Sequence, residues 1–328
     1  MTPALIVTVD TEEEGLWKGS FHAQGNTVEN TRGIERFQSL CDRFGVTPTY
    51  LVDTPVVEDD RSVEMLRGMQ ERGRCEIGAH LHPWCSPPFE ETSSVENSFL
   101  CNLPEALQRR KLAQLTDRIE TRFGRRPVSF RAGRCGLDMT GARLLREVGY
   151  KVDSSVIPFY DYSSLGGPDF RGAPWSPYYA EGPGLFDSSR SGMLLEVPVS
   201  IGFNRAHFRR AQRVRDFALR QPWRSFRTVG ILDRLGLVSR IKFSPEQSTA
   251  TKMKTLIDVY LAQDLPCMVM ALHSSSLVPG HSPYVPDAGR LERFYGELEE
   301  TLRYACTERG MAGRTLAGFA ENFDGRRS

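Results

Sequence analysis

The chain has 328 residues, of which 40% are hydrophobic and 25% are charged, values ordinary for a folded globular protein. Its formal net charge of +1 gives no overall field for nucleic acid or a membrane, and no apolar stretch approaches the roughly 20 residues of a membrane span. The seven cysteines lack paired spacing, and the N-terminus runs into an apolar segment without a basic region. We therefore expect a cytoplasmic protein with no signal peptide and no nucleic-acid partner.

Strand-like and helix-like segments alternate along the chain. Short apolar runs predict strands at 4–9, 46–52, 75–79, 128–131, 150–153, 194–201 and 267–273. Apolar residues at helical spacing predict helices at 34–44, 62–72, 104–123 and 140–148, and basic helices are expected at about 205–240. Strands alternating with helices indicate a parallel sheet or barrel. Because no linker separates a second unit, 1–328 is predicted to form one domain.

Polar side chains follow several of the predicted strands. Asp10 and Glu12 come after the first strand, and His80 and His82 come after the third. Alternate residues of an extended segment project to the same side, so each pair can face one point. Later strands are followed by Arg131, Arg134, Asp153 and His273. Because parallel strands end at one face of a barrel, these residues predict an active site there.

The two histidines suggest a metal site. Two imidazole nitrogens and a carboxylate are typical ligands of a divalent ion, so one of Asp10 and Glu12 can bind it while the other stays free as a base. The alternative is a histidine pair in a surface turn that Pro83 ends. Glu13 and Glu14 are interpreted as a solvated acidic turn.

Five short motifs resemble the signature segments of the NodB-type polysaccharide deacetylases, carbohydrate esterase family 4. In chain order they are VTVDTEEE, EIGAHLHPW, SFRAGRCG, YKVDSS and MALHSSS, and they extend from Leu5 to about Ser276. They are most similar to a branch found in bacterial surface-polysaccharide and lipopolysaccharide gene clusters. The resemblance implies a distorted (β/α)7 barrel that hydrolyses N-acetyl or O-acetyl groups of sugars with a divalent metal ion.

The resemblance also assigns catalytic roles. Asp10 corresponds to the general base that activates the attacking water. Arg131 corresponds to the arginine that pairs with this carboxylate and lowers its pKa by favouring the charged form. His273 corresponds to the general acid that protonates the leaving group, and Asp153 is expected to orient His273.

The metal ligands implied by the resemblance are Glu12, His80 and His82, and they depart from the usual pattern. Thr11 stands where the family has a second aspartate, so Glu12 is expected to replace it. The family's paired histidines lie four residues apart, whereas His80 and His82 lie two apart. Zinc is the expected ion, and cobalt or nickel also fits these ligands. Such an ion is a Lewis acid that lowers the pKa of bound water from 15.7 towards about 7.

Four residues are expected to bind the substrate: Trp84, Arg134, Trp175 and Tyr178. The last two belong to an insertion at about 158–192 that is rich in proline, glycine and aromatic residues. Such a segment is either an irregular surface loop or an aromatic wall that stacks on sugar rings.

The segment 205–227 contains eight arginines and one acid, Asp216. It is either a solvated basic helix or a phosphate site for a nucleotide-linked or lipid-linked sugar, because arginine binds phosphate bidentately.

The sequence therefore predicts a metal-dependent hydrolase that removes an acetyl group, N-acetyl rather than O-acetyl, from a sugar. Two alternatives stay open. One is a hydrolase of another amide, such as a cyclic imide, on the same barrel. The other is a metal-free barrel that binds sugars without catalysis.

Overall fold

The structure is a computed structural model that describes residues 2–19, 21–182, 184–189, 191–221, 223–226 and 228–323. Pro183 and Arg190 of the predicted insertion, and Pro222 and Arg227 of the predicted basic helices, lie outside the described residues.

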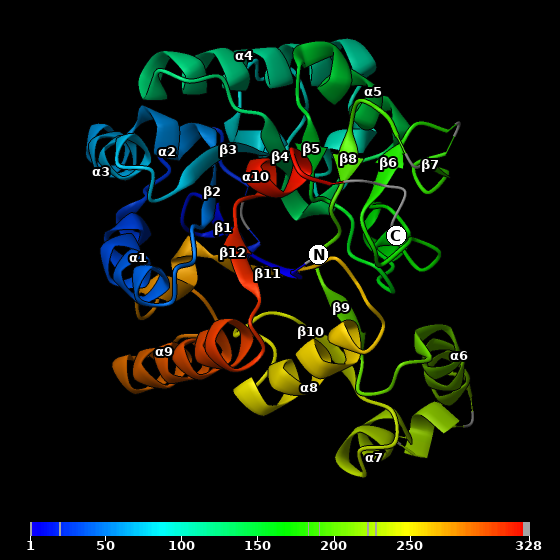
Figure 1. Cartoon of the computed structure of the whole chain (residues 1–328). Helices are drawn as coiled ribbons and strands as arrows, with labels where there is room; N and C mark the ends of the chain where they lie inside the picture. The colour runs from blue at the N-terminus through cyan, green and yellow to red at the C-terminus, as the bar shows by residue number, and fades with distance from the viewer. Residues whose placement is uncertain are drawn as a thin grey trace.

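Seven parallel strands of the described chain pair side by side in a curved sheet at the centre of Figure 1. In pairing order they are β11 (Cys267–His273), β1 (Ala4–Thr11), β2 (Thr49–Val52), β3 (Glu76–Leu81), β4 (Ser129–Ala132), β5 (Val152–Asp153) and β8 (Leu195–Glu196). β1 is buried at all eight positions, as a continuous apolar run in a sheet covered on both faces requires.

A short antiparallel pair closes this sheet into a distorted barrel. The pair consists of β9 (Ile201–Phe203) and β10 (Arg240–Lys242). The N–H of Ser200 donates to the carbonyl oxygen of Val269 in β11 at 3.1 Å, and the N–H of Phe243 donates to that of Ser200 at 2.9 Å. The predicted α/β fold class, a distorted (β/α)7 barrel, is confirmed.

Helices cover the outside of the sheet (Figure 1). They are α1 (Ile34–Arg43), α2 (Thr54–Glu58), α3 (Asp60–Glu71), α4 (Glu105–Phe123), α5 (Met139–Val148), α6 (Phe208–Ala218), α7 (Thr228–Arg234), α8 (Ala250–Leu261), α9 (Ala288–Leu302) and α10 (Leu316–Ala320). Gly124 and Gly149 end α4 and α5 in the left-handed conformation, with φ of 73° and 105°, which a side chain would disfavour. None of the helices in the described chain has the length and apolar character needed to cross a membrane.

Three further strands extend the sheet. The insertion 158–192 contributes β6 (Tyr178–Ala180), which pairs antiparallel with β8, and β7 (Ser188–Ser189), which pairs antiparallel with β6. β12 (Ala312–Arg314) pairs with the first half of β1. The basic segment forms α6 and α7, which lie at the lower right of Figure 1.

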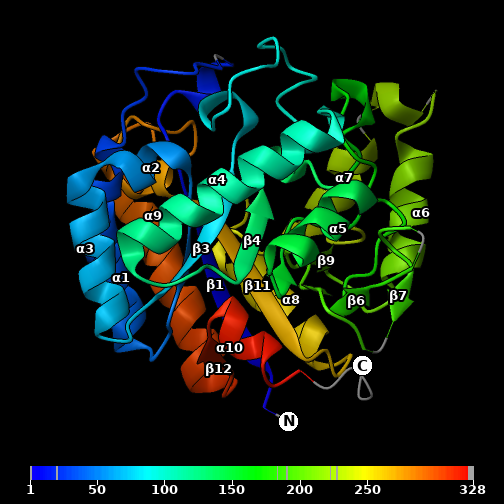
Figure 2. The same ribbon diagram turned by 90° about the horizontal axis from the view of Figure 1, so that it is seen from above.

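The carboxyl ends of the parallel strands meet at one end of the barrel. Figure 2 shows this end at the top, with the blue loop after β1 and the cyan loop after β3. The strand register aligns Asp10 with His273 and His80 with Arg131 as direct neighbours. Residues from distant motifs are thereby placed side by side.

Candidate active site

A cavity of about 510 Å³ opens at the carboxyl ends of the parallel strands. Seven of the predicted site residues line it: Asp10, Glu12, His80, His82, Arg131, Arg134 and His273. The position agrees with the general rule that barrels build their active sites at this end of the strands.

Glu12, His80 and His82 form a compact buried group, with exposed fractions of 1%, 2% and 0%. An oxygen of Glu12 lies 3.4 Å from Nε2 of each histidine. Nδ1 of His80 lies 3.0 Å from the carbonyl oxygen of Arg131, which can only accept a hydrogen bond. His80 therefore donates from Nδ1, and its Nε2 faces Glu12.

The residues of this group fit a divalent cation. Oε1 of Glu12 and Nε2 of His82 are buried and have no hydrogen-bond partner within the described chain. Leaving a buried polar atom unpaired costs about 1–3 kcal/mol, so two such atoms in one group favour a bound partner such as a cation. Two histidine nitrogens and a carboxylate oxygen suit zinc.

Burial shifts the pKa of the histidine and of the carboxylate in this group. It holds the pKa of His82 well below its ordinary value, which keeps the ring neutral, the form that binds metal ions. Burial also raises the pKa of Glu12 well above its ordinary value. A cation beside Glu12 would favour the charged carboxylate and offset this effect.

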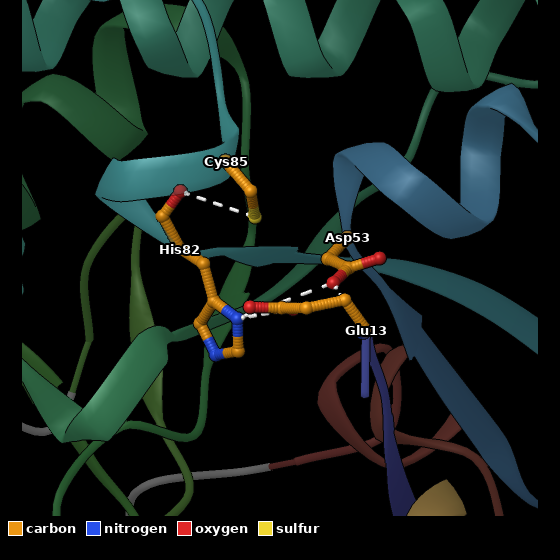
Figure 3. A group of neighbouring side chains, drawn as sticks. All are labelled: Glu13, Asp53, His82 and Cys85. Carbon is orange, nitrogen blue, oxygen red and sulfur yellow. Dashed lines mark hydrogen bonds and ion pairs between the residues drawn. The ribbon is translucent and has the colours of Figure 1, made fainter. Parts of the chain in front are cut away.

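A second group of potential ligands lies on the other side of the His82 ring: Glu13, Asp53 and Cys85 (Figure 3). Here the polar atoms already have partners. Nδ1 of His82 lies 2.8 Å from Glu13, and Asp53 accepts from the backbone N–H groups of Glu13 and Val56 at 2.8 and 3.0 Å. We infer that this group orients His82, because metal-binding histidines commonly donate their second N–H to a carboxylate.

The interpretation of Glu13 as part of a solvated turn is wrong. The chain folds back so that Glu13 is 2% exposed and accepts a hydrogen bond from the indole of Trp84 at 2.6 Å. Trp84 in turn stacks on His82 with ring centroids 4.2 Å apart. Glu14 instead ties the loop together by accepting from the N–H of Asn30 and pairing with His281, both at 2.8 Å.

Two neighbouring features fix the position of His82. The ammonium group of Lys111, which is fully buried, donates to the carbonyl oxygens of Pro83 and Ser86 at 2.9 and 2.6 Å and so holds the turn after β3. A Cβ atom on Gly133 would overlap the His82 ring, which explains a glycine in the SFRAGRCG motif.

Asp10 forms a buried ion pair with Arg131. Nη1 of Arg131 donates to Oδ1 of Asp10 at 2.6 Å, and Ser154 holds the rest of the guanidinium. Burial alone would raise the pKa of Asp10, but the charge of Arg131 leads the opposing effects and holds that pKa below its ordinary value. Asp10 is therefore ionised, and its second oxygen lies 3.8 Å from Nε2 of His273.

Glu246, rather than Asp153, orients His273. Its carboxylate lies 3.0 Å from Nδ1 of His273 and also accepts the backbone N–H of His273 at 3.0 Å. The predicted role of Asp153 is wrong because Glu246 occupies Nδ1 of His273, while the carboxylate of Asp153 accepts from the hydroxyl of Ser155 at 2.6 Å. Burial and the charge of Asp153 raise the pKa of the neighbouring Glu196 well above its ordinary value.

His273 carries a proton at neutral pH. Burial by itself lowers the pKa of His273, but the charge of Glu246, followed by that of Glu12, outweighs burial and raises the pKa to about 9. A protonated imidazole at this position has the form that a general acid needs.

Replacing Glu246 with glutamine tests this arrangement. The pKa of His273 should fall because the nearest negative charge is gone. A step that needs protonated His273 is lost as the pH rises through its pKa, so the basic limb of the activity profile should begin below pH 9 in Glu246→Gln. The exposed Glu71→Gln is the control, and an unchanged profile together with an unchanged NMR titration of His273 would contradict the role of Glu246.

The predicted substrate residues divide into two sets. Arg134 lines the cavity, and Trp84 lies behind His82. Trp175 and Tyr178 are not among the described residues that line the cavity, and their prediction is wrong. Trp175 packs between Phe159 and Phe208, with centroids 5.7 and 5.6 Å away, and Tyr178 is buried in β6, because the insertion folds onto the core.

Trp17 is an aromatic wall residue that the sequence did not reveal. Its indole donates to the hydroxyl of Ser275 at 3.1 Å, and its ring lies edge-on to His273 and Tyr284 at 5.0 and 5.2 Å. The only available signal was a tryptophan in the loop after the first motif. Asp53 was detectable by a stronger signal, because it follows the apolar strand TYLV in the same way that Asp10 follows the apolar run 4–9.

Comparison of the sequence with family models and with curated proteins gives no match. Solved structures match over nearly the whole chain. A protein of Parabacteroides distasonis described as a glycoside hydrolase or deacetylase has a TM-score of 0.60 at 13% identity, over 98% of this chain and 71% of that one. A probable polysaccharide deacetylase of Pseudomonas aeruginosa PAO1 has a TM-score of 0.53 at 16% identity, over 97% and 89%.

The Puue allantoinase is equally similar, with a TM-score of 0.53 at 15% identity over 97% of this chain and 89% of that one. At these identities the likeness establishes the fold that this chain shares with polysaccharide deacetylases. Because proteins of this fold carry different activities, the reaction has to be argued from the site residues.

Proposed function

We propose that this protein is a metal-dependent hydrolase that removes an acetyl group from a sugar. One observation carries the proposal: Asp10, His273 and the buried group of Glu12, His80 and His82 line the same cavity. Hydrolysis of an amide or ester needs a base for the attacking water, an acid for the leaving group and stabilisation of the negative charge on the carbonyl oxygen.

Glu12, His80 and His82 would hold the divalent ion, with zinc as the first choice. When bound, the ion would supply Lewis-acid polarisation of the carbonyl and a lower pKa for the attacking water. The unpaired atoms of Glu12 and His82 support an occupied site over a metal-free, non-catalytic barrel, since such a barrel would have to tolerate both.

The ion pairs Asp10–Arg131 and His273–Glu246 determine which atoms can take up and release protons. Arg131 holds one oxygen of Asp10, which leaves the other oxygen to take a proton from water. Glu246 holds Nδ1 of His273, which leaves Nε2 to give its proton to the leaving group. A proton donor placed in this way supports N-acetyl over O-acetyl substrates, because an amine leaves far less readily than an alkoxide without protonation.

The cavity is suited to a sugar. Its walls include Trp17, Phe21, Tyr162 and Tyr284, whose rings can pack against the C–H faces of a pyranose. Its volume of about 510 Å³ is within the range of small-molecule sites.

The test is acetate release by the zinc-loaded protein from a panel of N-acetylated and O-acetylated sugars, with allantoin as a competing substrate. We expect acetate from an N-acetyl sugar, loss of this activity after chelation and its return with zinc. Turnover of allantoin without acetate release would instead favour the alternative of a cyclic-amide hydrolase. Allantoin is chosen because the Puue allantoinase has a similar fold.

A further inference from the structure

Two positively charged side chains that have no part in the proposed proton steps line the cavity. They are Arg134, which follows β4, and Lys242, which ends β10. Both are half-buried, and within the described chain neither forms an ion pair. The two acids among the lining residues are engaged elsewhere, Asp10 with Arg131 and Glu12 with the histidines.

The two cations share one cavity wall with few competing charges. Arg134, Cys135 and Lys242 are all among the residues that line the cavity, and Cys135 directly follows Arg134 in the chain. Both positive charges therefore border the space that a substrate would occupy.

The backbone of this segment is strained. Arg134 and Cys135 are consecutive residues with φ of 53° and 60°, a left-handed conformation that costs non-glycine residues roughly 1–2 kcal/mol each. The guanidinium is held in place by the carbonyl oxygen of Val95, the hydroxyl of Ser98 and the ring of Phe99, whose centroid lies 4.3 Å away. Strain of this kind accumulates where a side chain serves a ligand.

We propose that the substrate is an acetylated sugar with an anionic substituent, a carboxylate or a phosphoryl group, and that Arg134 and Lys242 bind this substituent. The inference rests on the proposed function and extends it to the substrate class. Two cations beside the aromatic and aliphatic side chains of Phe21, Val95 and Ile157 have reduced solvation, and an anionic ligand would supply the missing counter-charge. Of the described residues of the basic segment 205–227, none lines the cavity, so the anion site predicted there has no role in this one.

The test measures binding to the zinc-loaded full-length Asp10→Asn protein, in which turnover is prevented. The probes are N-acetylhexosamines in gluco and galacto configuration, each as the neutral sugar, the 6-phosphate and the 6-carboxylate. We expect an anionic form to bind about 10-fold to 100-fold more tightly than its neutral form, as charge-assisted hydrogen bonds provide. The phosphate and carboxylate arms identify which anion the site prefers.

The preference should disappear in Lys242→Gln and in Arg134→Gln, while the affinity for the neutral sugar stays the same. Lys151→Gln, which changes an exposed lysine, is the matched control and should bind all forms like the parent protein. Equal affinity for neutral and anionic forms, no binding of any form, or a preference that survives both substitutions would overturn the inference. Acetate release from a neutral sugar would leave the proposed function standing in each of these cases.

Discussion

Asp10→Asn should reduce the rate of acetate release about 1,000-fold while the protein stays folded, since general-base catalysis contributes roughly 100-fold to 10,000-fold. The asparagine keeps an oxygen that can accept the hydrogen bond from Arg131, but it cannot take a proton from water. The loss should appear in kcat rather than in KM. The measurement is steady-state kinetics with an N-acetyl sugar, supported by the thermal unfolding midpoint.

The exposed Asp117→Asn removes a charge of the same kind far from the cavity and should leave the rate unchanged. If Asp10→Asn retains the parent rate, Asp10 is not the base, and the proposed reaction fails with it.

The second large effect concerns the metal ion. The protein should bind about one zinc ion per chain, and His80→Ala should abolish this binding because it removes one of three ligands. Cys85→Ser should bind zinc normally, because Cys85 belongs to the group on the opposite face of His82. Isothermal titration with zinc and metal analysis after dialysis measure both variants.

His82 is shared by the two groups, so its replacement does not discriminate between them. Glu13→Gln should weaken zinc binding by roughly 10-fold to 100-fold, the usual effect of losing a group that orients a ligand. The reverse result, in which Cys85→Ser loses zinc and His80→Ala keeps it, would place the ion between Glu13, Asp53, His82 and Cys85.

Most of the fold was predictable because its signals are local. The apolar run at 4–9 became β1, and the periodic segment 104–123 became α4, since burial on both faces or on one stripe leaves a pattern in the sequence. The short helix α2 was missed because five residues carry too little periodicity, although Asp53 caps it by accepting from the N–H of Val56. The short strands β6, β7 and β10 were missed for the same reason.

Some residues of the site were predictable from local signals and others were not. Asp10, Glu12, His80, His82, Arg131 and His273 were predictable because each stands at a strand end and matches a motif. The partners that orient them were not. Glu246 lies 27 residues before His273, and Asp53 lies 40 residues after Glu13, so no spacing rule connects them.

The insertion 158–192 shows what composition alone cannot predict. Its composition allowed either a surface loop or a sugar-binding wall. Neither alternative takes into account how the segment packs against the rest of the protein. The tertiary structure divides the insertion: Tyr162 lines the cavity, whereas Trp175 packs against Phe159 and Phe208, because burial of these apolar rings is favourable.

The sequence by itself determined the α/β barrel and the chemical types available at its strand ends, because periodicity and strand-end position are properties of neighbouring residues. The tertiary structure decided which groups act together. It placed Glu13 beside His82 and paired His273 with Glu246 rather than with Asp153. It also left Arg134 and Lys242 on the cavity wall with no ion-pair partner among the described residues. Hydrogen bonds and ion pairs depend on distances of a few ångströms, and only the closing of the barrel sets these distances between residues far apart in the chain.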